Sequence, residues 1–204
     1  MKKGKYIVFE GINGAGKTTQ IKRVTQWLGR QLKNTPYHVT REPGGTILGD
    51  KLREIVCEDF FSTDEVARLL LFFADRAQHF SMRIIPALDR GEWVLSDRDV
   101  SSSFAYQCAH AAHPEIVSDR ISTLLEWVNE GYTPDIKILI DVSPQIALQR
   151  VNNKGEQFAD QVAKNYRVMA EIEHKSWIVV DGNNSPDEVY EDIIKALTVK
   201  FFKE

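Results

Sequence analysis

Short apolar runs alternate with longer amphipathic segments along the chain. Runs rich in β-branched and aromatic residues cover residues 6–9, 37–40, 92–96, 136–140 and 177–180. In the segments between them, apolar residues recur every three or four positions, a spacing that predicts helices. Because strands that alternate with helices usually form a covered parallel sheet, the pattern predicts a three-layer α/β fold with a five-stranded parallel sheet flanked by helices.

The expected helices can be bounded by their periodicity. The first begins at Thr19, and its apolar stripe extends to Leu32. The next helices are expected over residues 48–56, 64–85, 101–111 and 115–129. The last three are expected from 143 up to a polar stretch at 152–157, over 158–174, and from 185 onward.

Local signals mark where some of these helices begin and end. Thr63 is in position to cap the helix over residues 64–85, and Pro86 is expected to end it. Ser185 and Glu188 have the spacing of a capping box. Since no linker-like segment interrupts the pattern, we expect a single domain over residues 1–204, with a short lid near residues 150–157.

Composition and charge narrow the class of protein. A length of 204 residues suits one domain, and a net charge of -3, from 26 basic and 29 acidic residues, argues against a general nucleic-acid binder. The apolar run after the basic amino terminus ends at Glu10, too early for a signal peptide or a membrane span. Cys57 and Cys108 lack metal-like spacing, which favours free thiols and a cytoplasmic location.

The stretch GINGAGKT at residues 11–18 follows the first apolar run and precedes a helix. This is the G-x-x-x-x-G-K-S/T phosphate loop (P-loop) in the context that the motif requires, although a glycine turn that binds nothing is the simpler alternative. Lys17 is expected to reach the outer phosphates of ATP, and the Thr18 hydroxyl to bind Mg²⁺. The expected ATP-binding residues are Gly11, Ile12, Asn13, Gly14, Ala15, Gly16, Lys17, Thr18 and Thr19.

A phosphate loop alone does not distinguish a switch, a motor and a kinase. The chain lacks the N-K-x-D motif of a GTPase and the signature of transporter ATPases. Instead, Arg41 and Arg98 follow the second and third predicted strands, and Arg76 lies in a predicted helix. Each arginine taken alone suits a protein surface. Together, at strand ends where α/β folds bind ligands, they indicate a cationic cage for two phosphates.

Several motifs resemble those of thymidylate kinases. They are the stretch at 9–19, the loop TREPGGT at 40–46, LFFADR at 71–76, and Asp97-Arg98 followed by Ser102 and AYQ at 105–107. The resemblance extends over essentially the whole chain. It implies transfer of the γ-phosphoryl group of ATP to dTMP, giving dTDP and ADP, with Mg²⁺ as cofactor. It also implies a homodimer, although the apolar face of Leu69, Leu70 and Phe73 would equally serve the core.

By position, the resemblance assigns roles to individual side chains. The catalytic set would be Lys17, Asp97, Arg98, Arg150 and Lys154, with Thr18 and Asp97 near the metal. The acceptor would be bound by Asn13, Arg41, Phe72, Arg76, Arg98, Ser103 and Tyr106. In this scheme Arg41 and Arg98 bind the acceptor phosphate and Phe72 stacks on the thymine ring. Arg76 and Ser103 recognise the polar edge of the thymine ring. Tyr106 packs on the sugar. For Phe72 and Tyr106, ordinary core packing is the alternative.

Three positions depart from the family pattern. Asn13 stands where a carboxylate usually binds the sugar 3′-hydroxyl, and Asp99 where tyrosine or histidine usually follows the Asp-Arg pair. An anion at Asp99 would repel bound phosphates unless it points away or binds the metal. The lid has Lys154 in place of the usual arginine, so we expect Arg150 and Lys154 to serve together as its cations.

These departures leave two alternatives open. Asn13 and Asp99 favour an enzyme of the same type with another or broader acceptor, such as dUMP or a modified pyrimidine deoxynucleotide. The missing lid arginines favour a nucleotide-binding protein with little catalysis. The five histidines receive no role, because phosphoryl transfer of this type depends on positioning and charge rather than on a strong base.

Overall fold

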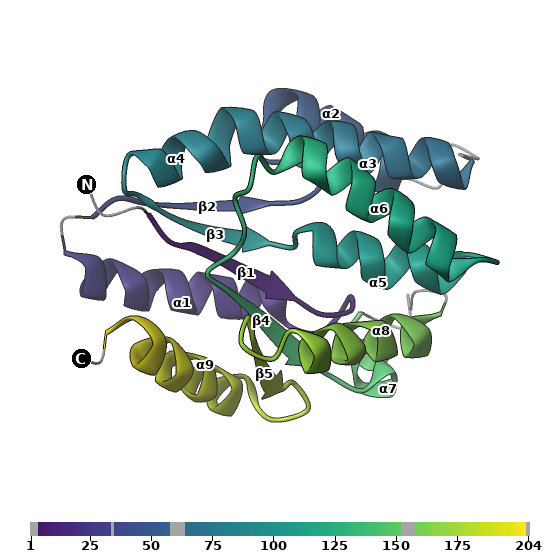
Figure 1. Cartoon of the computed structure of the whole chain (residues 1–204). Helices are drawn as coiled ribbons and strands as arrows, with labels where there is room; N and C mark the ends of the chain where they lie inside the picture. The colour runs from purple at the N-terminus through teal and green to yellow at the C-terminus, as the bar shows by residue number, and fades with distance from the viewer. Residues whose placement is uncertain (1–3, 34, 58–63, 152–157, 203–204) are drawn as a thin grey trace.

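A computed structural model describes residues 4–33, 35–57, 64–151 and 158–202. Its strands form one parallel sheet in the order β2-β3-β1-β4-β5 (Figure 1). Their bounds are β1 (Tyr6–Glu10), β2 (Tyr37–Arg41), β3 (Trp93–Asp97), β4 (Ile136–Asp141) and β5 (Trp177–Asp181). The predicted fold class and strands are therefore confirmed. In the register, Asp97 lies beside both Arg41 and Phe9, so the ends of β1, β2 and β3 meet at one edge.

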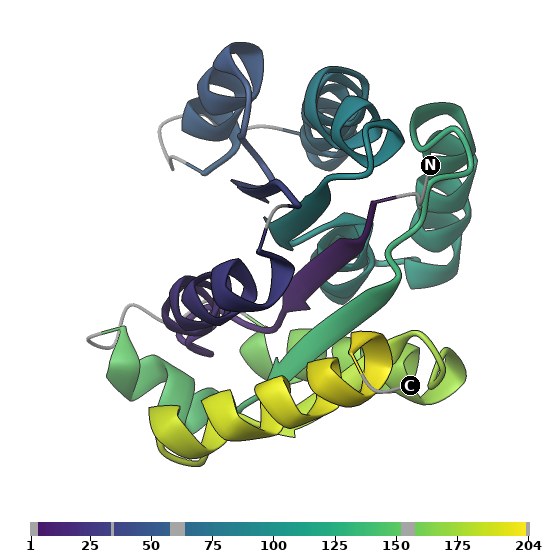
Figure 2. The ribbon, with the colours of Figure 1, turned by 90° about the vertical axis from the view of Figure 1, so that its left-hand side faces the viewer.

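Helices cover both faces of the sheet (Figures 1 and 2). One face carries α1 (Lys17–Leu32) and α9 (Pro186–Phe201). The other carries α3 (Glu65–His79), α4 (Ile85–Asp89), α5 (Val100–His110), α6 (Pro114–Val128) and α8 (Ala159–Ile172). The remaining helices are α2 (Ile47–Cys57), which packs on α3, and α7 (Pro144–Arg150), which follows β4. No helix among the described residues is both long and apolar enough to cross a membrane.

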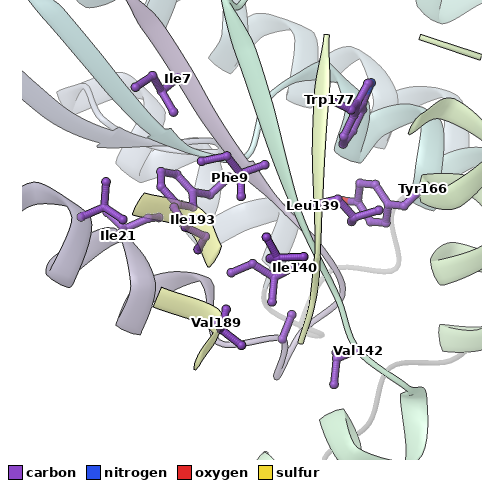
Figure 3. Packing of buried hydrophobic residues seen from close by; sticks show 14 of the residues in the cluster. Ile7, Phe9, Ile21, Leu139, Ile140, Val142, Tyr166, Trp177, Val189 and Ile193 are labelled. Carbon is purple, nitrogen blue, oxygen red and sulfur yellow. The ribbon is translucent and has the colours of Figure 1, made fainter. Parts of the chain in front are cut away.

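The core lies on both sides of β1. Ile7 and Phe9 belong to the cluster that includes α1 and α9, and Figure 3 shows Phe9 near Ile193. Tyr6 and Val8 alternate with them and belong to a second cluster with α4 and the turn before it. Because successive side chains of a strand point to opposite faces, a strand buried on both sides reads as a continuous apolar run.

The prediction of one continuous helix over residues 64–85, ended by Pro86, is wrong. The helix α3 stops at His79, and a π-helical turn, η1 (Phe80–Ile84), leads into α4. The amide of Ile85 donates to the carbonyl of Phe80, five residues earlier. Pro86 lies in the first turn of α4, where a missing amide hydrogen is tolerated, and therefore does not end the helical path.

Caps at two helix starts can be compared with their predictions. Asp64, not Thr63, caps α3, because its Oδ1 accepts from the amides of Val66 and Ala67 at 2.9 and 3.2 Å. The capping box before α9 is confirmed: Ser185 Oγ accepts from the Glu188 amide, and the Glu188 carboxylate accepts from the Ser185 amide. Thr63 and most of the expected lid lie outside the described residues.

Candidate phosphate and acceptor cleft

The phosphate loop connects β1 to α1 at the edge where the strands end. Gly16 has φ 98°, and α1 begins directly after it at Lys17, two residues earlier than predicted. The Lys17 ammonium donates to the carbonyls of Gly11 and Ile12 at 2.9 and 3.1 Å, so it spans the loop. A Cβ atom on Gly14 would lie 2.4 Å from the carbonyl oxygen of Ala147, which means that α7 packs directly against the loop backbone.

A large cleft opens in front of this loop, with a volume of about 1320 Å³. The loop residues from Asn13 to Thr19 line it, together with four other side chains that the sequence predicted for the site. These are Arg41, Asp97, Arg98 and Arg150. The structure thus brings together, from four separate parts of the sequence, the predicted phosphate-binding groups. Such a concentration of fixed cations beside backbone amides is suited to two phosphate groups held close together.

The guanidinium of Arg98 has an unusually complete set of partners. Its Nη2 donates to Asn13 Oδ1 at 2.8 Å and to the Tyr106 hydroxyl at 3.1 Å. Its Nη1 donates to Ser102 Oγ at 2.9 Å and to the Tyr166 hydroxyl at 3.0 Å. The backbone of Arg98 has φ 78°, which is uncommon for a residue other than glycine. The side chain is therefore fixed at the wall of the cleft rather than mobile on the surface.

Glu10, at the end of β1, lies behind Arg98. It is fully buried, and its Oε2 accepts from Ser102 Oγ and from the Tyr166 hydroxyl, each at 2.8 Å. Burial, reinforced by the nearby Asp99 carboxyl, raises the pKa of Glu10 to about 8, while Arg98 acts in the opposite direction. Since the same two hydroxyls accept from Arg98, Glu10 orients the groups that hold the guanidinium.

Asp97 and Thr18 are the groups expected near a metal. Both line the cleft. Asp97 Oδ1 is buried and accepts no hydrogen bond from the described part of the chain, which is a costly arrangement unless a ligand or water completes it. Thr18 is an exposed residue in the first turn of α1. A carboxylate oxygen without a partner beside a phosphate loop is the kind of ligand that Mg²⁺ prefers.

The loop after β2 is held by a buried network of polar side chains. Glu42 Oε1 forms a hydrogen bond with His79 Nδ1 at 3.0 Å, and Glu42 Oε2 accepts a hydrogen bond from Arg76 Nε at 2.8 Å. The other nitrogen of the His79 ring lies 2.6 Å from Thr40 Oγ1, on the strand that leads into the loop. The loop that carries Arg41 is thus anchored to α3 by groups with almost no contact with water.

A second contact fixes the glycines of the same loop. The amide of Gly44 donates to Asp75 Oδ1 at 2.9 Å. Burial raises the pKa of Asp75 to about 7, although the Gly44 amide favours the ionised form. A Cβ atom on Gly49 would lie 2.4 Å from Asp75 Oδ1, and one on Gly45 would lie 2.4 Å from Thr40 Oγ1. A side chain at Gly45 would push the loop away from β2, and one at Gly49 would push α2 away from α3.

Comparisons with known proteins agree on one family. Residues 9–193 match the profile of the thymidylate kinase family. A thymidylate kinase of Carboxydothermus hydrogenoformans is 37% identical over 200 residues, covering 94% of this chain and 95% of the relative. One of Thiobacillus denitrificans is 39% identical, covering 95% and 96%. The chain belongs to the thymidylate kinase family. The crystal structure of thymidylate kinase from Ehrlichia chaffeensis superposes with a TM-score of 0.79 at 29% identity, covering 96% of this chain and 99% of that one.

The residues that the thymidylate kinase resemblance assigns to the base do not line the cleft. Arg76 is buried in its ion pair with Glu42, and its Nη1 donates to Ser103 Oγ at 3.3 Å. Phe72 is half-buried and lines neither the cleft nor the smaller cavity behind it. Tyr106 contacts Arg98 through both its hydroxyl and its ring, whose centroid lies 5.0 Å from the guanidinium carbon. The structure therefore joins Arg76 to Ser103 and Tyr106 to Arg98, as two separate groups.

The predicted lid cations are only partly described. Arg150 ends α7, lines the cleft and donates to the carbonyl of Gly182 at 3.0 Å. Its position follows from the packing of α7 on Gly14. Lys154 lies outside the described residues.

Asp99, which departs from the thymidylate kinase pattern, faces away from the cleft. It is 3% exposed, and its Oδ1 accepts from the Ser101 amide at 2.7 Å, which makes it the N-cap of α5. Asp99 lines the smaller cavity, of about 260 Å³, and not the cleft. Repulsion of bound phosphates by Asp99, the concern raised by the sequence, is therefore reduced by its orientation.

Sequence reasoning missed five residues of the site: Glu10, Glu42, Asp75, His79 and Tyr166. Glu10, Glu42 and Asp75 were part of the quoted motifs but received no role. Asp75 and His79 are spaced by four residues in a predicted helix, so they share one face. The signal available in the sequence was this pair of titratable side chains on one face of a predicted helix. Their partners on β2 and its loop could not be read from the sequence.

Proposed function

We propose that this protein transfers the γ-phosphoryl group of ATP to dTMP, producing dTDP and ADP. The observation that carries the proposal is the single cleft in which the phosphate loop faces Arg41 and Arg98, in a member of the thymidylate kinase family. The triphosphate of ATP binds the loop amides and the N-terminus of α1, with Lys17 at the outer phosphates. The acceptor phosphate binds Arg41 and Arg98 over the ends of β2 and β3.

In this arrangement a phosphate oxygen of dTMP attacks the γ-phosphorus in line with the departing ADP. Catalysis depends on alignment and on charge stabilisation, so no strong general base is required. Lys17, Arg98 and Arg150 are the described cations that stabilise the transferred group, and Lys154 is proposed to join them from the lid. Arg41, now paired with Asp50 at 3.1 Å, would exchange that exposed partner for the acceptor phosphate.

Mg²⁺ is the cofactor that this chemistry needs. Thr18 and Asp97 would hold it, because both residues line the cleft and Asp97 Oδ1 accepts no hydrogen bond from the described residues. When bound, the ion neutralises charge on the phosphate groups. The protein residues contribute the rest: the loop binds, Arg98 orients, and the cleft walls exclude water.

For the base, we propose that Phe72, Arg76 and Ser103 recognise thymine, and that Asn13 and Tyr106 lie at the sugar. Support comes from the Arg76–Ser103 contact and from the contacts of Arg98 with Asn13 and Tyr106. Because these two groups do not share the cleft, the acceptor site is expected to rearrange when dTMP enters. Movement of Phe72 toward the cleft is the main change required.

The proposal includes a cytoplasmic homodimer. Leu69 and Phe73 are buried in the core, but Leu70 on the same helix is half exposed. On the adjacent helix α6, Trp127 is 77% exposed. A second copy covering these apolar side chains is the simplest use of them. Sedimentation should give twice the mass of 23.3 kDa, and a single species at monomer mass would refute the dimer.

The function is tested by measuring ADP formation from ATP and Mg²⁺ with dTMP, dUMP, dCMP, dGMP, CMP and UMP offered separately. We expect a clear preference for dTMP, abolished in Lys17→Ala. Preference for another monophosphate would transfer the function to that acceptor and implicate Asn13. Binding of ATP without turnover on any acceptor would favour the alternative of a nucleotide-binding protein with little catalysis.

A further inference from the structure

The Tyr166 hydroxyl lies at the centre of the polar groups behind Arg98. Tyr166 comes from α8 and is 1% exposed. Its hydroxyl accepts a hydrogen bond from Arg98 Nη1 at 3.0 Å and donates one to Glu10 Oε2 at 2.8 Å. It also lies 2.9 Å from Ser102 Oγ. A single hydroxyl from α8 therefore contacts the end of β1, the first part of α5 and the arginine that precedes α5.

This hydroxyl can serve both partners because it keeps its proton at neutral pH. Burial foremost, reinforced by the nearby Glu10 carboxyl, raises the pKa of Tyr166 well above its ordinary value. A neutral hydroxyl has one hydrogen to donate and lone pairs that accept. Tyr166 therefore donates to Glu10 while it accepts from Arg98, and the two contacts coexist.

The sequence neighbours of Tyr166 hold α8 in place. Asn165 Nδ2 donates to the carbonyl of Ala105 on α5 at 2.9 Å. Arg167 Nε donates to Asp141 Oδ2, at the end of β4, at 2.8 Å. These contacts tie α8 to a helix and to a strand on either side of Tyr166. The position of the hydroxyl is therefore set by the scaffold and not by its contact with the arginine.

The hydroxyl keeps the guanidinium apart from the buried carboxyl. Arg98 Nη1 lies 3.8 Å from Glu10 Oε2, beyond hydrogen-bond distance. The hydroxyls of Tyr166 and Ser102 bridge these two groups. The other terminal nitrogen of Arg98, Nη2, donates to Asn13 Oδ1 of the phosphate loop at 2.8 Å. Without the Tyr166 hydroxyl, a direct contact between Arg98 and Glu10 becomes accessible, and it would draw the guanidinium away from the cleft.

We propose that Tyr166 is a positioning residue for the acceptor phosphate: its hydroxyl bridges Arg98 to the buried Glu10 and so holds the guanidinium at the wall of the cleft. This inference rests on the proposed function, in which Arg98 binds the phosphate of dTMP. Tyr166 does not line the cleft, so its effect on the acceptor passes through Arg98.

The first test compares wild type, Tyr166→Phe and Tyr6→Phe in the full chain. Tyr166→Phe keeps the ring, which packs edge-on against Tyr106 with centroids 6.4 Å apart, and removes only the hydroxyl. Since Arg98 loses an acceptor, we expect KM for dTMP to rise about tenfold while KM for ATP stays within about twofold. Tyr6→Phe is the matched control, because Tyr6 is also fully buried and lines neither the cleft nor the smaller cavity. It should leave both constants within about twofold of wild type.

A double variant shows whether Tyr166 acts through Arg98. Arg98→Lys keeps the positive charge but removes the planar fork that the hydroxyl orients. Adding Tyr166→Phe to Arg98→Lys should therefore change KM for dTMP by less than about twofold. Calorimetric titration with dTMP gives the same comparison as Kd where turnover is slow. A tenfold effect of Tyr166→Phe in both backgrounds would overturn the positioning role, because the hydroxyl would then act independently of Arg98.

The remaining outcomes are equally decisive. An unchanged KM for dTMP in Tyr166→Phe overturns the positioning role, and so does a parallel rise in KM for ATP, which would indicate a general loss of packing. If Tyr166→Phe does not fold, Asn165→Ala carries the test: it loosens α8 from α5, so KM for dTMP alone should rise about threefold, and no rise overturns the proposal. A wild-type protein that makes no ADP from dTMP refutes the proposed function. Normal wild-type turnover with an unchanged Tyr166→Phe refutes the positioning role alone.

Discussion

The two halves of the cleft are built in different ways. The half that faces ATP is one continuous stretch of chain, in which backbone amides, three glycines with positive φ and Lys17 form the binding surface. The half that faces the acceptor depends on Arg41 and Arg98, which lie far apart in sequence. Buried side chains from β1, α3, α5 and α8 hold them or their loops in place. The first half depends on local geometry, and the second on a balance of buried charge.

Breaking the buried charge balance should have the largest effect. Glu42→Gln removes the negative partner of Arg76, and both side chains are at most 3% exposed. Since the guanidinium is left buried and unpaired, we expect the free energy of unfolding to fall by about 3 to 5 kcal/mol. Glu54→Gln is the control, because its pair with Lys51 is exposed and should contribute less than about 1 kcal/mol. Urea unfolding that gives equal losses for the two variants would contradict this picture.

On the ATP side the largest effect should be on catalysis rather than on stability. Lys17→Ala removes the ammonium directed at the outer phosphates, and we expect kcat to fall by about 10²- to 10³-fold. Lys22→Ala, on the exposed side of the same helix, should leave kcat unchanged. Steady-state ADP production measures both. A Lys17→Ala enzyme with nearly normal kcat would mean that the loop holds ATP without stabilising the transferred group.

Alanine variants of two glycines in the phosphate loop distinguish the effect of steric packing on stability from that of backbone strain. A Cβ atom on Gly14 would lie 2.4 Å from the carbonyl oxygen of Ala147, whereas a Cβ atom on Gly16 would have nothing within 4 Å. Both residues have positive φ, so both alanine variants carry similar backbone strain. We expect Gly14→Ala to be less stable than Gly16→Ala by about 1 to 3 kcal/mol, because only Gly14→Ala displaces α7. Equal melting temperatures would show that α7 moves freely.

Glu10 offers a smaller effect that depends on pH. Its pKa rises from 4.5 to about 8 on folding, so between these values the folded protein retains a proton that the unfolded chain has lost. The free energy of unfolding should therefore decrease as pH rises through this window, by at most about 1.4 kcal/mol per pH unit. Glu10→Gln should remove this contribution. Parallel pH profiles of stability for wild type and Glu10→Gln would show that Glu10 is ionised throughout.

The contrast between the two halves also explains what the sequence could predict. The phosphate loop is specified by adjacent residues, and the strands by their apolar runs, so both could be read directly. The strand-end arginines were predicted by their place in the chain, because parallel strands end at one edge. The π-helical turn before Pro86 was missed, since periodicity does not distinguish an inserted residue from a continuous helix.

The buried partners of the arginines were beyond sequence reasoning for a different reason. His79 was left without a role, and its contacts with Thr40 and Glu42 join residues almost forty positions apart. The sequence left open whether Asp99 faces the cleft, because its burial at the start of α5 depends on packing between distant segments. Such packing depends on three-dimensional proximity, which a single sequence does not record.

The most direct test of this account is the pair of Michaelis constants in His79→Phe. This change keeps a ring in the core but removes the contacts with Thr40 and Glu42, neither of which belongs to the phosphate loop. If the acceptor half depends on buried side chains and the ATP half does not, KM for dTMP should rise about tenfold while KM for ATP stays within about twofold. A parallel rise in both constants, or no change in either, would contradict the division of the cleft into two independently supported halves.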